Sequence, residues 1–369
     1  MASKCILIIN AGSSSIKYAL YDADSLVLTE KKTLEIKDKD GYEAAFDSIL
    51  KLVETKDIAG IGHRIVHGGK DYALPEAIDA KVLADLEALV PLAPLHQPHN
   101  LKAVKMVADK YPSLTQVACF DTAFHRTQPH LNQIYALPRA LTDEGIIRYG
   151  FHGSSYEYIS SVLPQYTDKQ RVIVGHLGNG ASLCAMKGGK SVASTMGFTP
   201  LDGLMMGTRT GSIDPGVLLH LIEQKGMTAK AISDVFNKQS GLKGVSGITA
   251  DMRELLASSK PEAKEAVDLF CLYVARHVAS LTVDLGGLDA LVFTAGIGEN
   301  SAIIREKICA NLTHLGVKCD PSTTGPSLHA KDSAVEVYAI KTNEELMMAQ
   351  HVKNALQPAK PNNAPKMML

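Results

Sequence analysis

Residues 5–22 read CILIINAGSSSIKYALYD, and this stretch indicates the class of fold. An apolar segment at 5–10 is followed by the loop Ala-Gly-Ser-Ser-Ser and by a second apolar segment at 16–22. Short apolar runs separated by a Gly- and Ser-rich loop are typical of two strands and a turn. We therefore expect the chain to begin with a β-hairpin.

A similar pattern returns in the second half of the chain. Residues 171–176 and 181–186 are apolar, and Leu-Gly-Asn-Gly lies between them. Asn-Gly between two apolar runs is a strong hairpin signal. The two hairpins share an order of apolar strand, small-residue loop and apolar strand. We interpret this as a weak internal repeat, which predicts two related domains.

Strands and amphipathic helices alternate through the rest of the chain. Further strands are expected at 26–34, 58–67, 116–120, 290–294 and 335–340, and helices around 46–53, 82–89, 101–109, 261–285 and from 301. Capping boxes are expected at Ser154-x-x-Glu157 and Thr342-x-x-Glu345. This alternation indicates an α/β protein. Because of the hairpins, the sheets should be mixed and not wholly parallel.

Length and composition exclude several classes of protein. A chain of 369 residues predicts about two or three domains. Its 38 Lys and Arg balance 39 Asp and Glu, which argues against a nucleic-acid binder with a global basic field. No run approaches 18 uninterrupted apolar residues, so no membrane span is expected. The six cysteines form no Cys-x-x-Cys pair, and we interpret them as reduced core residues of a cytoplasmic protein.

Three Gly-rich turns could hold phosphate groups. They are NAGSSSIK at 10–17, HLGNG at 176–180 and GIGEN at 296–300, and each follows an apolar strand. Taken singly, the first two fit ordinary hairpin turns, and the third fits a strand–helix turn equally well. The first also lacks the spacing of a P-loop. Together they favour a phosphate-bearing ligand held by backbone N–H groups from two domains.

Four polar residues stand where side chains could do chemistry. Arg64 lies in GHRIVHGG at 62–69, Asp121 follows an apolar strand, His152 lies between Phe and Gly, and Arg209 lies in a small-residue loop. A strand edge, a turn cap, a structural histidine and a surface loop are the respective alternatives. The polar segment LHQPHN at 95–100 is interpreted as a turn and assigned to structure. No His-Glu-x-x-His or Gly-x-Ser-x-Gly motif occurs. Scattered cations and phosphate-type loops favour phosphoryl transfer, which depends on positioning and charge neutralisation.

These motifs, taken together, closely resemble the acetate kinase family. The resemblance runs in order from about residue 5 to 350, through NAGSSSIK, GHRIVHGG, FDTAFH, YGFHGS, HLGNG, MGFTP, MGTR, GSIDP, TAGIGEN and TNEE. It implies the fold of the acetate and sugar kinase, Hsp70 and actin superfamily: an α/β protein with two ribonuclease-H-like, mixed-sheet domains around a nucleotide cleft. It also implies acetate and ATP as substrates, ADP as product, magnesium or else manganese as the metal, and a homodimer.

The resemblance also divides the chain. Residues 1–150 and 345–356 would form an N-terminal domain that carries the acyl and magnesium sites, 151–344 would form the nucleotide-binding domain, and 357–369 would be a disordered tail. The chain is shorter than usual for this family between residues 34 and 58. None of the quoted motifs lies in that segment.

The resemblance implies roles for individual residues. The residues that act on the reacting groups would be Arg64, Asp121, His152 and Arg209. Magnesium would be positioned by Asn10 and Glu344, with Glu345 as the competing choice, although we expect Glu345 to cap the last helix. The nucleotide and its phosphates would be contacted by Ser13, Ser15, Lys17, His176, Leu177, Gly178, Asn179, Gly180, Asp251, Met252, Arg253, Gly296, Ile297, Gly298, Glu299 and Asn300.

Acyl-chain length is the finer question. The resemblance places Val66, Leu95, Phe151 and Pro200 around the acetate methyl group, together with Arg64 at the carboxylate. A valine at 66 narrows this pocket, so propionate should be a poorer substrate, although one methylene is worth only about 1–3 kcal/mol. A propionate or butyrate kinase of the same family is one alternative. A non-catalytic nucleotide-binding module, like the actin or Hsp70 relatives, is the other.

Overall fold

The computed structural model describes residues 4–12, 14–36, 39–320, 322–323 and 325–357. Ser13 and all but the first residue of the predicted 357–369 tail lie outside the described residues. The chain divides into two compact units. Unit 1 comprises Met1–Ala123 and Glu344–Leu369, and unit 2 comprises Phe124–Asn343.

Unit 1 is built on a six-stranded mixed sheet. Its strands lie in the order β3(Leu28–Glu35), β2(Ser15–Asp22), β1(Cys5–Ala11), β4(Ile58–Ile65), β6(Gln116–Phe120) and β5(Glu76–Ala77). The central strands β1, β4 and β6 are parallel, whereas β2, β3 and β5 pair antiparallel with their neighbours. The predicted first hairpin is β1–β2, with Asn10 opposite Lys17.

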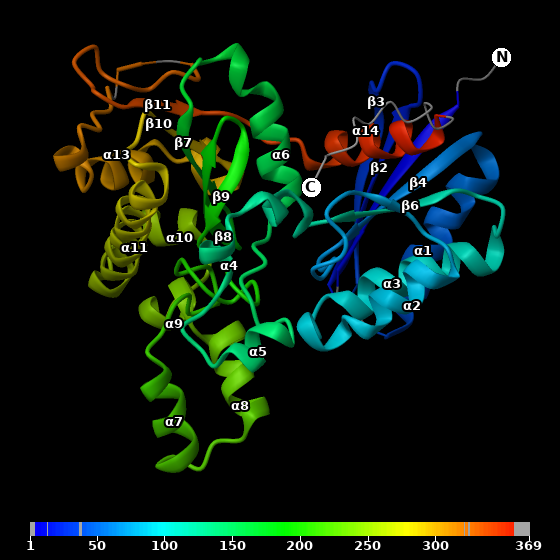
Figure 1. Ribbon diagram of the computed structural model, residues 1–369, viewed down its shortest axis with the longest axis horizontal. Coiled ribbons are helices and arrows are strands. Elements are labelled where there is room, and N and C mark those ends of the chain that lie inside the picture. Colours follow the sequence, from blue (N-terminus) through cyan, green and yellow to red (C-terminus); the bar gives the residue numbers. More distant parts are fainter. Residues whose placement is uncertain (1–3, 13, 37–38, 321, 324, 358–369) are drawn as a thin grey trace. The chain divides into compact units, whose positions relative to one another are not determined.

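Helices cover both faces of this sheet (Figure 1). On one face, α1(Lys39–Thr55) and α3(Gln97–Lys110) pack on an apolar cluster that includes Leu7, Ile9 and Phe46. On the other face, α14(Glu344–Leu356) buries Met348, Ala349 and Val352 against Ile6 and Ile8. The remaining helical segments are α2(Ala80–Ala88) and η1(Val90–Leu92). Helix α14 therefore completes a core that begins more than 300 residues earlier in the chain.

Unit 2 repeats this strand arrangement, without a counterpart of β5 among its described residues. The order is β9(Lys190–Ser194), β8(Ala181–Lys187), β7(Arg171–Leu177), β10(Ala290–Thr294) and β11(Glu336–Ala339). Strands β7, β10 and β11 are parallel, and β8 and β9 are antiparallel. Each sheet thus has a central strand with a meander on one side and two parallel strands on the other. The mixed α/β fold predicted from the sequence is confirmed, and both sheets have the strand order expected of related domains.

The long helix α11(Pro261–Leu285) packs on β8 and β9 of this sheet. Among the described residues, it alone is long and apolar enough by composition to cross a membrane. Ten of its residues are buried, however, as in the core helix of a globular domain. The other helices of unit 2 are α4(His130–Gln133), α5(Arg139–Asp143), α6(Gly153–Val162), η3(Leu163–Gln165), α7(Pro215–Glu223), α8(Ala229–Asp234), η4(Val235–Gln239), α9(Gly241–Ser246), α10(Met252–Ala257), α12(Ala295–Asn300), α13(Ala302–Ala310) and η5(Thr313–Leu315), and η2(Ala123–Thr127) begins at the unit boundary.

The first unit boundary falls at Ala123, about 27 residues before the predicted position of 150. The segment 124–150 is held to β9 by side-chain bonds to its backbone. Thr127 Oγ1 donates to Ser191 O at 2.8 Å, and Asn132 Nδ2 donates to Val192 O at 2.7 Å. These contacts join segments about 60 residues apart in sequence, and no local sequence pattern predicts them.

Three local expectations were wrong. Ser154 does not cap α6, because the helix already begins at Gly153 and His152 occupies the N-cap position without a side-chain cap bond. The 296–300 turn is instead the short helix α12. The polar segment 95–100 is not a turn either, since α3 begins at Gln97.

The expected role of Glu345 as a cap is not supported. Helix α14 begins at Glu344, and Glu345 forms an ion pair with Lys31 Nζ at 2.6 Å. The Thr342 hydroxyl is hydrogen-bonded to Ser155 Oγ at 2.9 Å within unit 2.

Candidate active site

In unit 1, predicted site residues meet at the carboxyl ends of neighbouring parallel strands. Asn10 lies near the end of β1, Arg64 near the end of β4, and Asp121 directly after β6. Arg64 donates from Nε and Nη2 to the two carboxylate oxygens of Asp121, at 2.9 and 2.6 Å. Its third nitrogen, Nη1, lies 3.4 Å from Asn10 Oδ1. This edge of a parallel sheet is where α/β proteins commonly bind ligands.

The Arg64–Asp121 pair is protected from water. Asp121 is 2% exposed, and the Arg64 side chain keeps about a quarter of its surface open. Burial lowers the pKa of Arg64, but Asp121 and the nearby Glu344 and Glu345 more than offset this effect, so its pKa is raised above the usual value. A two-point contact with a carboxylate fixes the plane of a guanidinium. Arg64 is therefore a rigid cation that still presents part of its surface.

Glu344 is a partly buried carboxyl group with a raised pKa. Its pKa is raised to about 7, mainly by burial and also by Asp121 and Glu345, while Arg64 and Lys17 oppose this shift. Because the Arg64 guanidinium is already engaged by Asp121, it cannot neutralise both carboxylates. A further positive charge close to Glu344 would favour its ionised form.

Two buried amides hold the backbone beside Arg64. Asn100 accepts from Val66 N and donates to Ala11 O, which ties the end of β4 to the end of β1. Gln97 accepts from His67 N and donates to His67 O. Both side chains come from the 95–100 segment. The polar side chains of this segment thus have a structural role. They form hydrogen bonds with backbone groups at the strand ends, where pairing with the neighbouring strand has stopped.

The remaining predicted residues of unit 1 differ in exposure. Val66 is buried, whereas Leu95 is 42% exposed. Ser15 is partly buried at the start of β2, and Lys17 is exposed on that strand.

In unit 2, two predicted histidines are stacked. The rings of His152 and His176 lie 4.2 Å apart, centroid to centroid, with an angle of 19° between planes. His152 has a positive φ of 59°, an uncommon conformation for a residue other than glycine. Its Nε2 lies close to Gly180. A Cβ added at Gly180 would be 3.3 Å from His152 Nε2 and 3.7 Å from Arg209 Nη1. His152, Gly180 and Arg209 are therefore neighbours.

Arg209 is placed by its own loop. Its Nη1 donates to Pro200 O at 3.0 Å and lies 3.7 Å from Met206 Sδ. The loop backbone is in turn fixed by bonds from Gly207 N to Asn179 O and from Met206 N to Arg209 O. Of the predicted acyl-pocket residues in this unit, Pro200 is partly exposed and Phe151 is 1% exposed.

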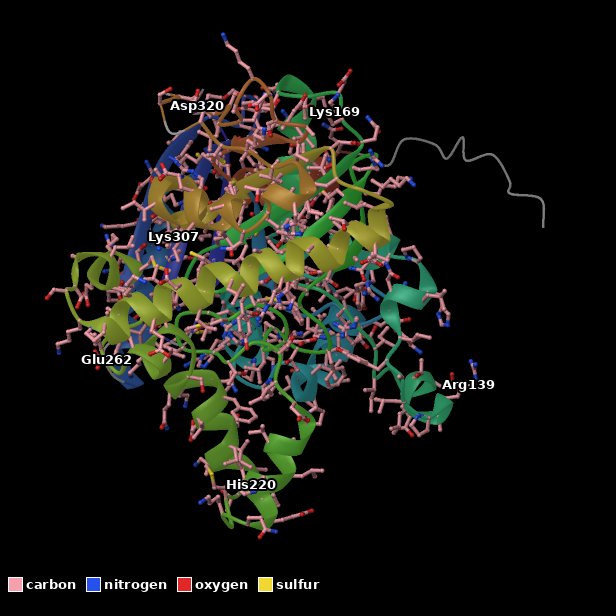
Figure 2. The ribbon with its side chains drawn as sticks, turned by 90° about the vertical axis from the view of Figure 1, so that its left-hand side faces the viewer. Arg139, Lys169, His220, Glu262, Lys307 and Asp320 are labelled. Atoms are coloured by element: carbon pink, nitrogen blue, oxygen red, sulfur yellow. The ribbon has the colours of Figure 1, made fainter. Side chains whose placement is uncertain are left out.

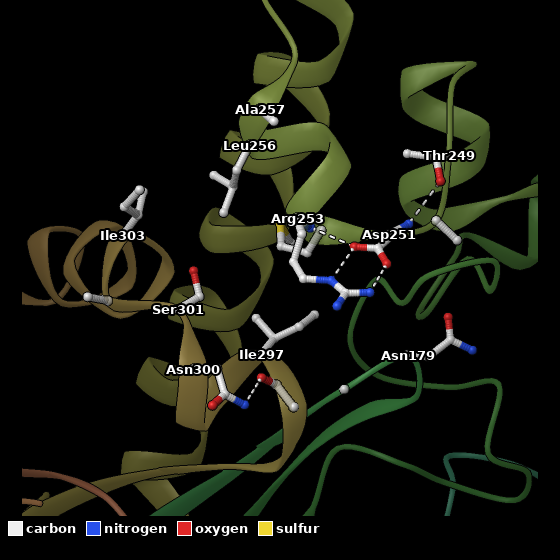
Figure 3. Close-up of a pocket in the computed structure, with 15 residues that line it drawn as sticks. Asn179, Thr249, Asp251, Arg253, Leu256, Ala257, Ile297, Asn300, Ser301 and Ile303 are labelled. Atoms are coloured by element: carbon white, nitrogen blue, oxygen red, sulfur yellow. Dashed lines mark hydrogen bonds and ion pairs between the residues drawn. The ribbon is translucent and has the colours of Figure 1, made fainter. Parts of the chain in front are cut away.

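A pocket of about 1090 Å³ opens in unit 2 (Figure 3). Predicted residues that line it are Gly178, Asn179, Asp251, Met252, Arg253, Gly296, Ile297 and Asn300. It lies between α10, α12 and the turn that follows β7. Three segments separated by some 70 and 40 residues of sequence thus line one cavity. Its size is at the upper end of the range for small-molecule sites.

Charge in this pocket is provided by Asp251 and Arg253. Asp251 caps α10 by accepting from Arg253 N at 2.8 Å, and its carboxylate forms an ion pair with Arg253 Nη2 at 2.6 Å. The hydrogen bonds from Arg253 lower the pKa of Asp251 to about 2. Figure 3 shows this pair at the side of the cavity, opposite Ile297 and Asn300.

Five predicted nucleotide residues of unit 2 do not line this pocket. His176 and Leu177 lie in β7, with the Leu177 side chain fully buried. Glu299 accepts from Ala295 N and Thr342 N, and Gly298 O accepts from Arg305 Nη1, so both serve the local structure. Gly180, which is also absent from the lining, faces His152.

Sequence reasoning missed part of the lining. These residues flank the predicted motifs: Thr249, Ala250, Leu256, Ala257, Ser301, Ala302 and Ile303. Ile303 is 52% exposed. An apolar residue at the first turn of a helix, directly after a Gly-rich motif, was the available signal.

Comparisons with known proteins agree with this picture. The profile of the acetokinase family matches residues 5–350. A protein named acetate kinase from Rhodopseudomonas palustris is 46% identical, over 95% of this chain and 98% of its own length. An acetate kinase from Rickettsia felis is 43% identical, over 95% and 99%.

Solved structures show the same fold. A propionate kinase from Francisella tularensis has a TM-score of 0.88 at 39% identity, over 95% of this chain and 99% of that one. Porphyromonas gingivalis acetate kinase has a TM-score of 0.85 at 35% identity, over 96% and 100%. This chain therefore belongs to the acetokinase family, whose members are ATP-dependent phosphotransferases. The non-catalytic alternative is not favoured.

Proposed function

We propose that this enzyme transfers the γ-phosphoryl group of ATP directly to acetate, giving acetyl phosphate and ADP, and that the reaction is reversible. The observation that carries this proposal is the Arg64 guanidinium, fixed by both oxygens of Asp121 at the ends of parallel strands and still partly exposed. Such a cation is suited to a small carboxylate or to a phosphoryl group. The acetate kinase relatives favour acetate as the acceptor.

No general base is needed for this reaction. A small carboxylic acid has a pKa near 4 and is already ionised at neutral pH. Its oxygen attacks the γ-phosphorus in line. Arg64 binds the acetate carboxylate or the phosphoryl group, and Arg209 and His152 bind the equatorial oxygens as charge develops there. Asp121 orients Arg64 and does not accept a proton.

We further propose that Asn10 and Glu344 hold magnesium. Both present oxygen, the ligand type that magnesium prefers, and a bound cation would favour the ionised form of Glu344, whose pKa is raised mainly by burial. The described residues contain no group of three or more His, Cys, Asp or Glu side chains that could hold a metal. This fits an ion that arrives with the nucleotide phosphates and keeps several waters. Bound there, magnesium would neutralise charge on the phosphates.

The pocket of unit 2 is proposed as the nucleoside site. Its apolar wall of Ile297, Leu256 and Ile303 suits a purine face, and Asp251 and Arg253 offer polar contacts to the nucleoside. Gly178 and Asn179 link this pocket to the turn that ends beside His152 and Arg209. Ser13, Ser15, Lys17, His176 and Gly180 are proposed to line the phosphate path.

The direct test is formation of acetyl hydroxamate from ATP, magnesium and acetate in the presence of hydroxylamine. We expect activity that disappears with EDTA and returns with added magnesium. Binding of ATP with no hydroxamate formed from any acyl acceptor would refute the proposal and support a nucleotide-binding module. Manganese should restore part of the activity.

Val66 and Leu95 of unit 1 and Phe151 and Pro200 of unit 2 are proposed to limit the acyl chain. Steady-state rates with acetate, propionate and butyrate test this. We expect kcat/KM to fall by roughly 10- to 200-fold for one added methylene. The Val66→Ala variant should narrow the difference between acetate and propionate. A wild-type preference for propionate would instead favour the alternative that the propionate kinase relative suggests.

We also propose a homodimer. Helix α7 has no buried residue, and its apolar side chains Val217, Leu218, Leu219 and Ile222 are 37–54% exposed. Figure 2 shows this helix, marked by His220, projecting at the end of unit 2. An exposed apolar helix face usually marks an interface. Light scattering should give twice the chain mass for the wild type and the chain mass for Leu219→Glu.

A cytoplasmic location is proposed on the state of the cysteines. None of the six described cysteines forms a disulfide bond, which suits a reducing compartment. Measurement of enzyme activity in separated cell fractions would test this.

A further inference from the structure

Two cysteines of unit 2 that are ten residues apart in sequence lie in contact. Cys309 is in the last turn of α13 and is 2% exposed, and Cys319 is partly exposed in the segment that follows. Their Sγ atoms are 2.8 Å apart, joined by a thiol–thiol hydrogen bond. A disulfide bond is about 2.05 Å long, so a shift of only about 0.8 Å would bring the sulfurs to bonding distance.

The surroundings favour Cys319 as the reactive thiol. The hydrogen bond with Cys309 and the Arg305 guanidinium lower its pKa, although burial and Glu306 oppose this shift. The opposite direction holds for Cys309, whose pKa is raised by the same hydrogen bond and by burial. A small cavity of about 40 Å³ borders Cys319 and is also lined by Arg305 and Asp320. Figure 2 marks its position by Asp320, at the surface of unit 2. A peroxide could therefore reach this sulfur.

We propose that Cys309 and Cys319 are a reversible redox modification site that closes to a disulfide when the protein meets a hydroperoxide. The Cys319 thiolate attacks one peroxide oxygen, the O–O bond breaks, and an alcohol or water leaves with Cys319 as a sulfenic acid. Cys309 then attacks that sulfur, the S–O bond breaks, and water leaves. Two thiols lose two electrons and two protons, and the peroxide is reduced. A dithiol reverses the step by exchange.

The site connects to the nucleotide pocket through α13. Ala302, at the first residue of α13, borders both the small cavity and the nucleotide pocket, and Arg305 donates to Gly298 O and Glu299 O of α12. A bond at the far end of α13 can therefore influence the residues that line the nucleotide site. We expect the oxidised protein to differ from the reduced protein in its Kd for ATP by threefold or more.

The test treats the reduced full-length protein with a small excess of hydrogen peroxide. Free thiols are then blocked with N-ethylmaleimide, and the peptides are analysed by mass spectrometry. We expect a peptide pair that joins Cys309 to Cys319, about 2 Da lighter than the two thiol peptides together, and its loss after dithiothreitol. Cys5 of unit 1, which is also partly exposed, serves as an internal control and should remain alkylated.

Two variants keep this proposal falsifiable. Cys309→Ser should stop the reaction at a Cys319 sulfenic acid that dimedone traps, whereas the wild type should give little adduct. Cys319→Ser should give no crosslink. The proposal would be overturned if N-ethylmaleimide alkylated both Cys309 and Cys319 of the peroxide-treated wild type and no crosslink formed. Sulfinic acid at Cys319 without a crosslink would also overturn it. An unchanged Kd for ATP after crosslinking would overturn the link to the nucleotide site.

A second, independent observation concerns how His152 is held. Its Nδ1 lies 2.8 Å from Ser182 Oγ, and Ser182 Oγ lies 2.5 Å from the hydroxyl of Tyr156. Ser182 and Tyr156 are fully buried. The stacked neighbour His176 is bonded in the same way, from Nδ1 to Ser155 Oγ at 2.9 Å. In both histidines, Nδ1 is hydrogen-bonded to a serine hydroxyl. The Nε2 of His176 lies near Gly178, and the Nε2 of His152 lies near Gly180.

The relative donor strengths of the two hydroxyl groups determine which atom donates in each of these hydrogen bonds. A phenol is a better hydrogen-bond donor than an aliphatic hydroxyl, so Tyr156 donates to Ser182 Oγ. The single Ser182 proton is then directed at His152 Nδ1, which must accept it. We propose that Ser182 and Tyr156 are positioning residues that keep the His152 proton on Nε2. This inference rests on the proposed function, in which that Nε2–H donates to the transferring phosphoryl group.

The test measures tautomer and turnover separately. Two-bond ¹H–¹⁵N spectra of histidine-labelled protein, with the His152 signals assigned by their loss in His152→Ala, should show the proton on Nε2. In Ser182→Ala and Tyr156→Phe, the Nδ1–H form should appear and kcat should fall about tenfold, while KM for ATP and acetate changes less than twofold. Ser160→Ala, which removes a serine bond elsewhere on α6, is the matched control and should retain wild-type kcat.

A double-mutant cycle separates positioning from general damage. In the His152→Ala background, Ser182→Ala should cause no further loss of kcat. A further tenfold loss there, or a wild-type proton on Nδ1, would overturn the positioning role. Wild-type turnover by His152→Ala itself would instead overturn the proposed catalytic use of His152, while the spectra still decide the tautomer.

Discussion

At the scale of single residues, cations and their fixed partners determine what the site can bind. Arg64 and Arg209 differ in how they are held. Arg64 is fixed by a carboxylate, whereas Arg209 donates to Pro200 O and contacts Met206 Sδ. Neither Pro200 O nor Met206 Sδ carries a charge, so we expect the loss of Arg209 to leave the fold largely intact.

We expect Arg209→Ala to lower kcat for acetyl phosphate formation by at least a hundredfold, because it removes a cation that stabilises transition-state charge. Its melting temperature should stay within about 2 °C of the wild type. Arg139→Ala, which changes an exposed arginine on α5, is the control and should retain full activity. Full activity in Arg209→Ala would show that this arginine has no part in the reaction.

A second residue-scale prediction concerns acid stability. His63 is 1% exposed, its Nε2 is bonded to Gln116 Oε1 at 2.7 Å, and burial lowers its pKa to about 4. Between pH 6.5 and 4 the unfolded chain binds a proton at His63 and the folded chain does not. The stability that the neutral histidine contributes is thus present above pH 6.5 and is lost as the pH falls towards 4.

Replacing His63 by glutamine, which stays neutral, should make the free energy of unfolding less dependent on pH in this range. The expected change in slope is up to about 1.4 kcal/mol per pH unit. Denaturant unfolding at pH 7, 6, 5 and 4.5 measures it. His314→Gln, an exposed change in η5, should keep the wild-type slope. If the free energy of unfolding of His63→Gln fell as steeply with decreasing pH as that of the wild type, the prediction would be contradicted.

At the scale of elements, the last helix packs on β4 at a position that has no side chain. Gly62 lies in β4, where an added Cβ would come within 2.7 Å of Ile8 Cδ1 and 2.9 Å of Val352 Cγ2. The close contact between α14 and the sheet requires this glycine. The sequence motif GHRIVHGG drew attention to the charged residues, and the packing role of its first glycine was not predicted.

We expect Gly62→Ala to destabilise the protein by about 1–3 kcal/mol, because the packed helix must move away from the sheet. Chemical denaturation measures the change. Gly296→Ala is the matched control, since no atom lies within 4 Å of an added Cβ there and its φ is negative. Equal stability of Gly62→Ala and the wild type would show that α14 can shift at no cost.

At the scale of the whole molecule, the proposed function divides between the two units. All described residues that line the proposed nucleotide pocket belong to unit 2, whereas Arg64, Asp121 and Glu344 belong to unit 1. Nucleotide binding and acyl phosphate formation should therefore respond differently to substitutions in unit 1.

We expect Mg-ADP at 100 times its Kd to raise the stability of the wild type by about 2.7 kcal/mol, and of Arg64→Ala by a similar amount. Arg64→Ala should nevertheless lose at least a hundredfold in kcat. Thermal denaturation with and without nucleotide gives the first quantity and the hydroxamate assay gives the second. Loss of the ADP-dependent stabilisation in Arg64→Ala would show that unit 1 is required for nucleotide binding.

Local sequence determined the class of fold, most strands and the family. Alternating apolar runs and Gly-rich turns carry that information because strand, turn and helix preferences act over a few residues. The strands at 116–120 and 290–294 and the helix at 261–285 were predicted with the bounds that the structure shows. The motifs also identified the residues of the candidate site, although their roles stay predictions.

Tertiary structure alone decided which of these residues meet. The pairing of Arg64 with Asp121, the stacking of His152 on His176 and the contact of Cys309 with Cys319 depend on strand order and on how the segments pack, which sequence spacing does not encode. The attachment of 124–150 to unit 2 has the same origin, because its hydrogen bonds run to a strand about 60 residues away. Propensity and periodicity are local quantities, whereas these contacts are fixed by the packing of distant segments around two cores.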